Sequence, residues 1–288
     1  MIKSPQNPFI LSGYYGAAWF CNREQELDKL YQHLENGRNV VLYSWRRLGK
    51  TALIKRFFDE LEQKNNIKTI YVDLLATQSM EEAIKAVTAA VHDKFGRSES
   101  GISAAMQRLF SSIGISLRFN QATGVPELFF GAQQPVEPEK SLNAIGTFLA
   151  GRKKKVVIAF DEFQQVSAYP KEQAEAAFRN WMQETPHLHF IYSGSHRKMM
   201  SSMFTEKNRP FYQSSQLMAI NPIEPEEYAV FITRHFNKSG KQIEPEAIRK
   251  IYKWCRGQTY SIQRVCNYLF GFRIGLWNYH NYQGFCIC

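Results

Sequence analysis

The stretch that decides the fold is Ser44-Trp45-Arg46-Arg47-Leu48-Gly49-Lys50-Thr51, which lies between an apolar run and an amphipathic run. The mostly apolar residues 39–43 predict a buried strand, and residues 50–63 carry apolar side chains at helical spacings of three and four. A loop ending in Gly-Lys-Thr between a strand and a helix is typical of phosphate binding, because backbone N–H groups at the helix start bind polyphosphate. We therefore expect residues 44–51 to bind ATP.

Two residues of this loop are expected to carry its chemistry. Lys50 would reach the β and γ phosphates as a catalytic cation, and the Thr51 hydroxyl would coordinate Mg²⁺. Ser44 stands where the pattern G-x-x-x-x-G-K-[ST] has its first glycine. Serine is small enough for a backbone that lies close to phosphate, but it departs from the pattern. The loop alone therefore leaves a coincidental match as the alternative.

An acidic pair, Asp161-Glu162, follows the apolar run at residues 156–160. At the end of a buried strand, Asp161 would hold Mg²⁺ through water, and Glu162 would orient and deprotonate the attacking water. The alternative is an acidic pair that caps a helix. Because both motifs occur in order, each at the end of a predicted strand, an ATP-hydrolysing site is favoured over this alternative.

Two further polar residues are candidates for sensing the nucleotide. Ser193 ends the next predicted strand, at residues 188–192, and could contact the γ-phosphate. This segment could equally be a turn in which Ser195 caps a helix. Arg209 precedes the last predicted strand, at residues 216–220, and is a candidate arginine finger acting on a neighbouring subunit. The alternative for Arg209 is an ordinary solvated side chain.

The order of predicted elements indicates an α/β protein. Strands alternate with helices up to residue 223, which predicts a parallel sheet covered by helices on both faces. A helix at residues 104–112 and a hairpin at 115–119 and 127–130 suggest an insertion within 101–140. Only helices follow Pro225. The predicted organisation is a P-loop core at 1–223, a small helical lid at 224–270, and a patternless, truncated or frameshifted tail at 271–288.

Composition fits an ordinary globular protein. The 288 residues are 44% hydrophobic, and no apolar run is long enough to span a bilayer. No signal peptide is recognised, so a cytoplasmic location and no membrane association are expected. The 5 cysteines show no paired C-x-x-C spacing, which argues against disulfides or zinc. A net charge of +10 leaves DNA open as a partner, although the basic run at 152–155 also suits a helix end.

The chain resembles the archaeal-type ATPase branch of the P-loop superfamily, an AAA-like and STAND-related group. The stretch Phe20-Cys21-Asn22-Arg23-Glu24-Gln25-Glu26-Leu27 is similar to that family's N-terminal motif. Residues 42–51 resemble its arginine-rich phosphate loop, with Ser44 as in bacterial members. Residues 160–164 match its D-E-[FIW]-Q form, and 190–195 its F-x-x-x-G-S segment. The stretches at 209–212 and 257–263 also fit, although Thr259 stands where proline is usual.

The resemblance implies an ASCE-type, three-layer α/β/α fold with strand order 5-1-4-3-2 and a helical lid. It implies that Arg23 lies near the adenine, that Arg264 is a candidate nucleotide-sensing arginine of the lid, and that nucleotide state drives conformational change or assembly.

The leading hypothesis is therefore a Mg²⁺-dependent ATPase that acts as a nucleotide-driven switch. It would bind ATP and ADP and act through a homo-oligomer or an unknown protein partner. The alternative is a nucleotide-dependent binding module with little turnover that associates with DNA. A small-molecule kinase is disfavoured, because Asp-Glu after this strand favours water as the acceptor.

Overall fold

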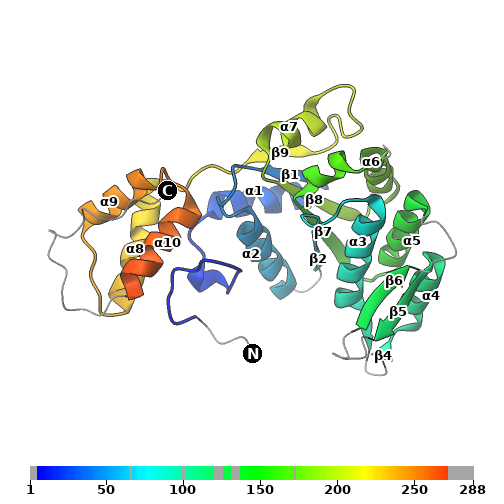
Figure 1. Ribbon diagram of the computed structural model, residues 1–288, viewed down its shortest axis with the longest axis horizontal. Coiled ribbons are helices and arrows are strands. Elements are labelled where there is room, and N and C mark those ends of the chain that lie inside the picture. Colours follow the sequence, from blue (N-terminus) through cyan, green and yellow to red (C-terminus); the bar gives the residue numbers. More distant parts are fainter. Residues whose placement is uncertain are drawn as a thin grey trace. The chain divides into compact units, whose positions relative to one another are not determined.

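A parallel five-stranded sheet is the centre of the structure, a computed structural model that describes residues 5–64, 67–98, 101–119, 126–130, 137–170 and 173–271 (Figure 1). The strands lie in the order β2-β7-β8-β1-β9, and all neighbours are parallel. Counted along the chain, this is the order 5-1-4-3-2, so the expected fold is confirmed. The strands are β1 (Val40–Tyr43), β2 (Ile67–Asp73), β7 (Lys155–Asp161), β8 (Leu188–Gly194) and β9 (Gln216–Ala219).

Helices cover both faces of this sheet. Figure 1 shows α2 on one face and α3, α5 and α6 on the other. The 3-10 helix η2 follows β7 directly, and α7 follows β8. The bounds are α1 (Glu24–Glu35), α2 (Lys50–Gln63), α3 (Met80–Phe95), α5 (Pro138–Ala150), η2 (Phe163–Ala168), α6 (Ala174–Glu184) and α7 (Arg197–Thr205).

The central strand β7 shows why the sheet is buried on both sides. Successive side chains of a strand point to opposite faces. Val156, Ile158 and Phe160 belong to the core cluster that includes α3, α5 and α6. The intervening Val157 and Ala159 are equally buried, which is consistent with cover by α2 on the other face. A continuous apolar run of this kind is what a parallel strand between two helical layers requires.

The segment predicted to be an insertion has its own small elements. Two short strands, β3 (Arg97–Ser98) and β4 (Gly101–Ile102), pair antiparallel before α4 (Ala104–Ser112). An antiparallel hairpin follows, made of β5 (Ile115–Phe119) and β6 (Pro126–Phe130). Residues 120–125, which connect the two strands, lie outside the described residues.

The chain divides into two compact units, which are described separately. The sheet unit comprises residues 24–46 and 50–221, and the helical unit comprises 5–23, 47–49 and 222–271 among the described residues. The helical unit contains η1 (Ala17–Trp19), α8 (Pro225–Lys238), α9 (Pro245–Trp254) and α10 (Thr259–Gly271). The expected tail beyond residue 271 lies outside the described part of the chain.

The N-terminal segment folds with the helices that end the described chain, whereas the sequence places it in the core at 1–223. Phe9 is buried, and its ring centroid lies 5.5 Å from that of Phe236 and 5.7 Å from that of Phe270. Asn7 donates to the Asn267 carbonyl at 2.8 Å, and Asn267 donates to the Phe9 carbonyl at 2.7 Å. A buried aromatic side chain and paired amides therefore fix this segment within the helical unit.

Candidate functional site

The candidate site lies where β1, β7 and β8 end in the sheet unit. In the parallel register Tyr43 pairs with Gly194, and Phe160 pairs with Tyr192. Ser44, Asp161 and Ser193 therefore come to the same edge of the sheet. In open α/β sheets this carboxyl edge, at the point where strand order reverses, is where ligands bind.

The start of the phosphate loop is anchored to the start of α2. Ser44 is fully buried, and its hydroxyl donates to the Trp45 carbonyl at 2.7 Å. Lys50 Nζ donates to Ser44 Oγ at 3.1 Å. The serine that replaces the usual first glycine therefore accepts a hydrogen bond from the lysine expected to bind phosphate.

Lys50 is a buried cation. Burial lowers the pKa of its ammonium group below 10.5, the nearby carboxylates of Glu162 and Asp161 act in the opposite direction, and Arg46 adds to the lowering. A desolvated cation interacts strongly with a polyphosphate because little water screens its charge. This arrangement is suited to an anionic ligand of high charge.

Asp161 is the centre of the polar cluster. Its Oδ2 accepts hydrogen bonds from Thr51 Oγ1 and from the Tyr71 hydroxyl, each at 2.6 Å. Its Oδ1 accepts from Ser193 Oγ at 2.7 Å and from the Glu162 backbone N–H at 3.1 Å. Burial and the Asp161 charge raise the pKa of Tyr71, so the tyrosine stays a donor. The carboxylate is therefore fixed in orientation on both oxygens.

Thr51 and Asp161 were expected to bind Mg²⁺, and their donor atoms fit that ion. Both supply oxygen, which Mg²⁺ prefers, and Mg²⁺ commonly takes only one or two protein ligands beside phosphate and water. Within the described residues no cluster of three or more His, Cys, Asp or Glu side chains is arranged to hold a metal. The residues therefore fit a metal bound together with a phosphate ligand.

Glu162 follows Asp161 in left-handed backbone conformation, with φ 54°. Its Oε2 accepts from Ser195 Oγ at 2.7 Å and from Gln164 Nε2 at 2.5 Å. Arg46 Nε lies 3.4 Å from the same Ser195 oxygen. Ser195 does not cap α7, because His196 occupies the capping position and accepts from the Met199 N–H at 3.3 Å.

The remaining loop residues, 47–49, group with the helical unit. Arg47 (φ 67°) and Gly49 (φ 93°) are both left-handed, which gives the loop its tight turn. The Arg47 guanidinium lies 4.3 Å from the ring centroid of Tyr260, whose backbone N–H donates to the Arg47 carbonyl. Arg23, buried and also left-handed, donates to the Leu48 carbonyl at 3.0 Å. The structure thus places Arg23 against the loop backbone.

Two predicted site residues, Trp45 and Arg209, interact with residues outside the polar cluster around Asp161. Trp45 is 64% exposed, with the Arg197 guanidinium 5.5 Å from its ring centroid. Arg209 is paired within the sheet unit, at 2.9 Å from Glu175 Oε1 and 3.2 Å from Ser167 Oγ. The guanidinium expected to act as a finger is therefore bound by its own chain. Arg264, in α10 of the helical unit, is exposed.

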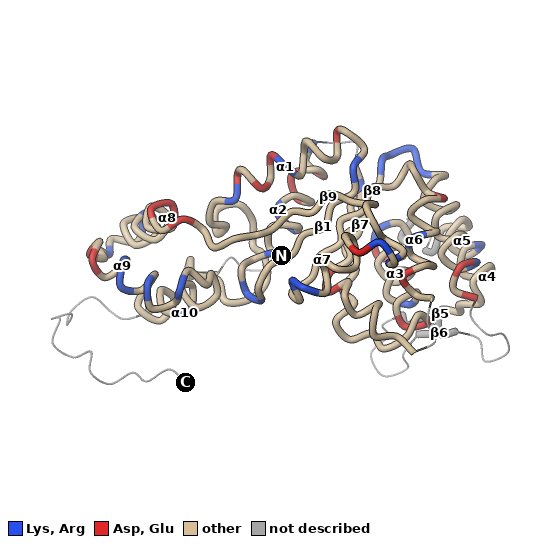
Figure 2. The backbone as a smooth tube through the Cα atoms, turned by 90° about the horizontal axis from the view of Figure 1, so that it is seen from above, with Lys and Arg blue, Asp and Glu red and all other residues tan. Residues whose placement is uncertain are grey.

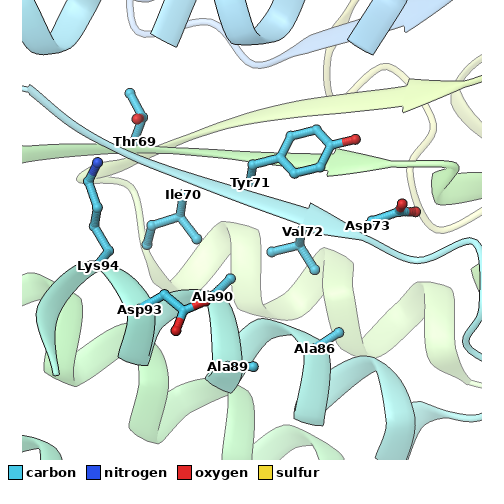
Figure 3. Close-up of a pocket in the computed structure, with 10 residues that line it drawn as sticks. All are labelled: Thr69, Ile70, Tyr71, Val72, Asp73, Ala86, Ala89, Ala90, Asp93 and Lys94. Atoms are coloured by element: carbon cyan, nitrogen blue, oxygen red, sulfur yellow. The ribbon is translucent and has the colours of Figure 1, made fainter. Parts of the chain in front are cut away.

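A separate hollow lies between β2 and α3 (Figure 3). Its volume is about 400 Å³, and small side chains from α3, such as Ala86 and Ala90, leave the space open. Figure 3 shows Ile70 and Val72 directed toward α3, while Tyr71 projects from the other side of the strand. Of the residues in the polar cluster, only Tyr71 lines this hollow, which is therefore distinct from the site at the strand ends.

Three contributors were not predicted from the sequence: Tyr71, Gln164 and Ser195. Tyr71 lies on β2, two residues before Asp73, which pairs in register with Asp161. The polar residue Asp73 at the end of this strand was the available signal that Tyr71 lies near the site. Gln164 and Ser195 follow Glu162 and Ser193 by two residues each, and nothing in their spacing alone indicates that they meet.

Comparison with known proteins places these features in a wider group. The sequence profile of a family described as "ATPase domain predominantly from Archaea" matches residues 20–265. An uncharacterized ATP-binding protein of Methanocaldococcus jannaschii is 44% identical over 52 residues, which are 17% of this chain and 88% of that protein.

Solved structures share the fold. The Walker-type ATPase of Pyrococcus abyssi superposes with a TM-score of 0.66 at 20% identity, over 92% of this chain and 72% of that one. The Aeropyrum pernix ORC2 protein in ADPNP-ADP complexes gives 0.58 at 16% identity over 90% of this chain. The ORC1 protein of the same organism in complex with DNA gives 0.59 at 13% identity over 92% of this chain. The chain spans 63% of the length of each Aeropyrum protein.

Proposed function

The chain belongs to the family of ATPase domains found predominantly in Archaea and is an ATP-binding P-loop protein; from this premise we propose that it hydrolyses ATP with Mg²⁺ and that its nucleotide state acts as a conformational switch. The observation that carries the proposal is the convergence of Lys50, Thr51, Asp161 and Glu162 at the ends of β1 and β7. These are the side chains that phosphate binding, metal binding and water activation require.

In the proposed reaction, Lys50 binds the β and γ phosphates and stabilises the charge that develops as the γ-phosphoryl group is transferred from ADP to water. Glu162 accepts the proton of the attacking water, for which a carboxylate must lie within hydrogen-bond reach. Thr51 and Asp161 would hold Mg²⁺, which supplies charge neutralisation on the phosphate oxygens when bound. Ser193 acts by fixing the orientation of Asp161.

The catalytic role of Arg209 is proposed only for an assembled form. In the single chain its guanidinium is paired with Glu175, so action on a neighbouring copy requires that this ion pair open. The partner proposed is a second copy of the chain or another protein whose binding opens this ion pair.

The alternative function is a nucleotide-dependent binding module that associates with DNA. The net charge of +10 supports it, as does the fold shared with an ORC1 protein whose structure contains DNA. Figure 2 shows Lys and Arg distributed over many elements with acidic residues between them, which argues for a general attraction to DNA rather than a local binding patch.

No helix in the described part of the chain has both the length and the apolar character needed to cross a bilayer.

The test is ATP hydrolysis by the purified chain with Mg²⁺ and with excess EDTA, with and without duplex DNA. The proposal expects Mg²⁺-dependent turnover, and a protease-cleavage pattern that differs between ADP and a non-hydrolysable ATP analogue. Tight ATP binding without turnover, together with DNA retention that depends on ATP, would favour the binding module instead. Mass measured with ATP reports assembly in the same samples.

A further inference from the structure

Glu162 is held more firmly than its position after a strand requires. Its backbone is left-handed (φ 54°, ψ 40°), a conformation that non-glycine residues adopt rarely and that persists only where neighbours impose it. Its carboxylate receives two hydrogen bonds on one oxygen, from Ser195 and from Gln164. These donors come from two separate segments, the loop after β8 and the helix η2.

The direction of the Ser195 hydrogen bond is determined by its neighbours. Arg46 Nε can only donate, so Ser195 Oγ accepts from it, in a long bond of 3.4 Å. The single hydroxyl proton is then directed to Glu162 Oε2, 2.7 Å away. The chain Arg46–Ser195–Glu162 thus connects the phosphate loop to the carboxylate by groups that all belong to the sheet unit.

Gln164 is fixed just as closely. It is 9% exposed, and its amide nitrogen donates to Glu162 Oε2. Its amide oxygen lies against Gly194, where an added Cβ would come within 2.3 Å. The absence of a side chain at 194 is therefore what allows Gln164 to approach Glu162.

We infer that Ser195 and Gln164 are positioning residues for the general base. They hold Oε2 of Glu162 so that Oε1 faces the attacking water. Through its hydrogen bond to Ser195, Arg46 couples the position of this carboxylate to phosphate bound at the loop. The inference rests on the proposed hydrolysis and goes further by naming the groups that orient its base. Within the described part of the chain, Oε1 accepts no hydrogen bond, so it remains the oxygen that can take a proton. A base fixed before substrate arrives loses little freedom during reaction, which lowers the barrier.

The inference is tested with Ser195→Ala, Gln164→Met and Ser195→Thr in the full chain. Removing either donor should lower kcat about 10- to 100-fold, the range for a lost hydrogen bond to a charged group, with KM and ATP affinity nearly unchanged. Ser195→Thr keeps the hydroxyl and should restore most of the loss. Ser202→Ala is the matched control, because it removes a hydroxyl from α7 that donates only to the Met199 carbonyl at 3.1 Å.

Each outcome separates this inference from the proposed function. Thermal melting verifies that each variant is folded, and a fluorescent ATP analogue verifies that it binds nucleotide. If Glu162→Gln abolishes turnover while Ser195→Ala and Gln164→Met keep the unaltered kcat, hydrolysis stands and the positioning role is wrong. If losses occur but Ser195→Thr does not restore activity, the hydroxyl is not the operative group and the inference is overturned. If the unaltered chain shows no turnover, the proposed function fails, and the inference fails with it.

Discussion

Replacing Gly194 with alanine should destabilise the sheet unit and disturb Glu162 at the same time. The added Cβ would lie 2.3 Å from Gln164 Oε1 and 2.4 Å from both Cγ and Sδ of Met200. Ordinary carbon contacts are about 3.5–4.0 Å, so each neighbour would have to move by more than 1 Å. Both neighbours are buried, which leaves them little room.

Overpacking of this kind costs about 1–3 kcal/mol of unfolding free energy. For a unit of this size, that corresponds to a fall in melting temperature of about 2–4 °C per kcal/mol. The φ of Gly194 is not in the left-handed region, so the cost arises from crowding and not from backbone strain. Because Gln164 is displaced, kcat should fall as well.

The assay is urea unfolding followed by tryptophan fluorescence, with ATP turnover measured on the same preparation. Gly151→Ala is the control, because its Cβ would meet only the Phe148 and Thr147 carbonyls at 3.6 and 3.8 Å. That change should alter stability by less than about 0.5 kcal/mol. A Gly194→Ala variant with an unaltered unfolding midpoint and kcat would refute the packing argument.

Other predictions concern the buried charges. Lys50→Ala should weaken ATP binding at least about tenfold in calorimetry, because a desolvated cation is lost; an unchanged Kd would contradict its role. Arg209→Ala should lower the unfolding free energy by about 1–3 kcal/mol, because Glu175, 11% exposed, loses its cation; equal stability would show that the ion pair is dispensable. Burial lowers the pKa of His235 from 6.5 to about 4 in the folded chain. The unfolding free energy should therefore be constant above pH 6.5 and fall as the pH drops from 6.5 toward 4, by at most about 3 kcal/mol, because the folded chain must then hold a buried, charged imidazole. Comparison with His235→Phe isolates this effect, and parallel pH–stability curves would contradict it.

The parts of the site that the sequence predicted are those tied to strand ends. Thr51 and Asp161 lie far apart in the chain, yet a parallel sheet brings the ends of its strands to one edge. An apolar run followed by a polar residue therefore predicts that the polar residue lies at this edge of the sheet. The strand order could be expected only through the family resemblance, because periodicity does not say which strands are neighbours.

The contacts around Glu162 could not be predicted in this way. Gln164 and Ser195 reach the carboxylate because Glu162 is left-handed and Gly194 leaves space, and both facts depend on backbone conformation. The pairing of Arg209 with Glu175 is similar, since it joins α6 to a loop before β9. Side chains that extend from loops acquire partners only when the whole unit has folded.

Two structural features did not follow from the sequence alone. Helix α7 follows Ser193, where the sequence left a helix open as one of two alternatives. It buries Met200, Met203 and Phe204, and their helical spacing of three and four favours that alternative. The N-terminal segment contains the apolar run Phe9-Ile10-Leu11 after Pro8, but nothing local indicates that Phe9 packs on the helices of residues 225–271. The first case is a matter of pattern, and the second depends on tertiary contacts.

The central claim is that Glu162 activates water for ATP hydrolysis at a site that binds ATP independently of this carboxylate. Glu162→Gln keeps the size of the side chain and removes the base, so a single-turnover assay with radiolabelled ATP measures the claim directly. The account predicts that the variant retains ATP with near-unaltered affinity and releases phosphate at least about 100-fold more slowly, the lower range for general-base catalysis. Phosphate release at the unaltered rate would show that another group is the base.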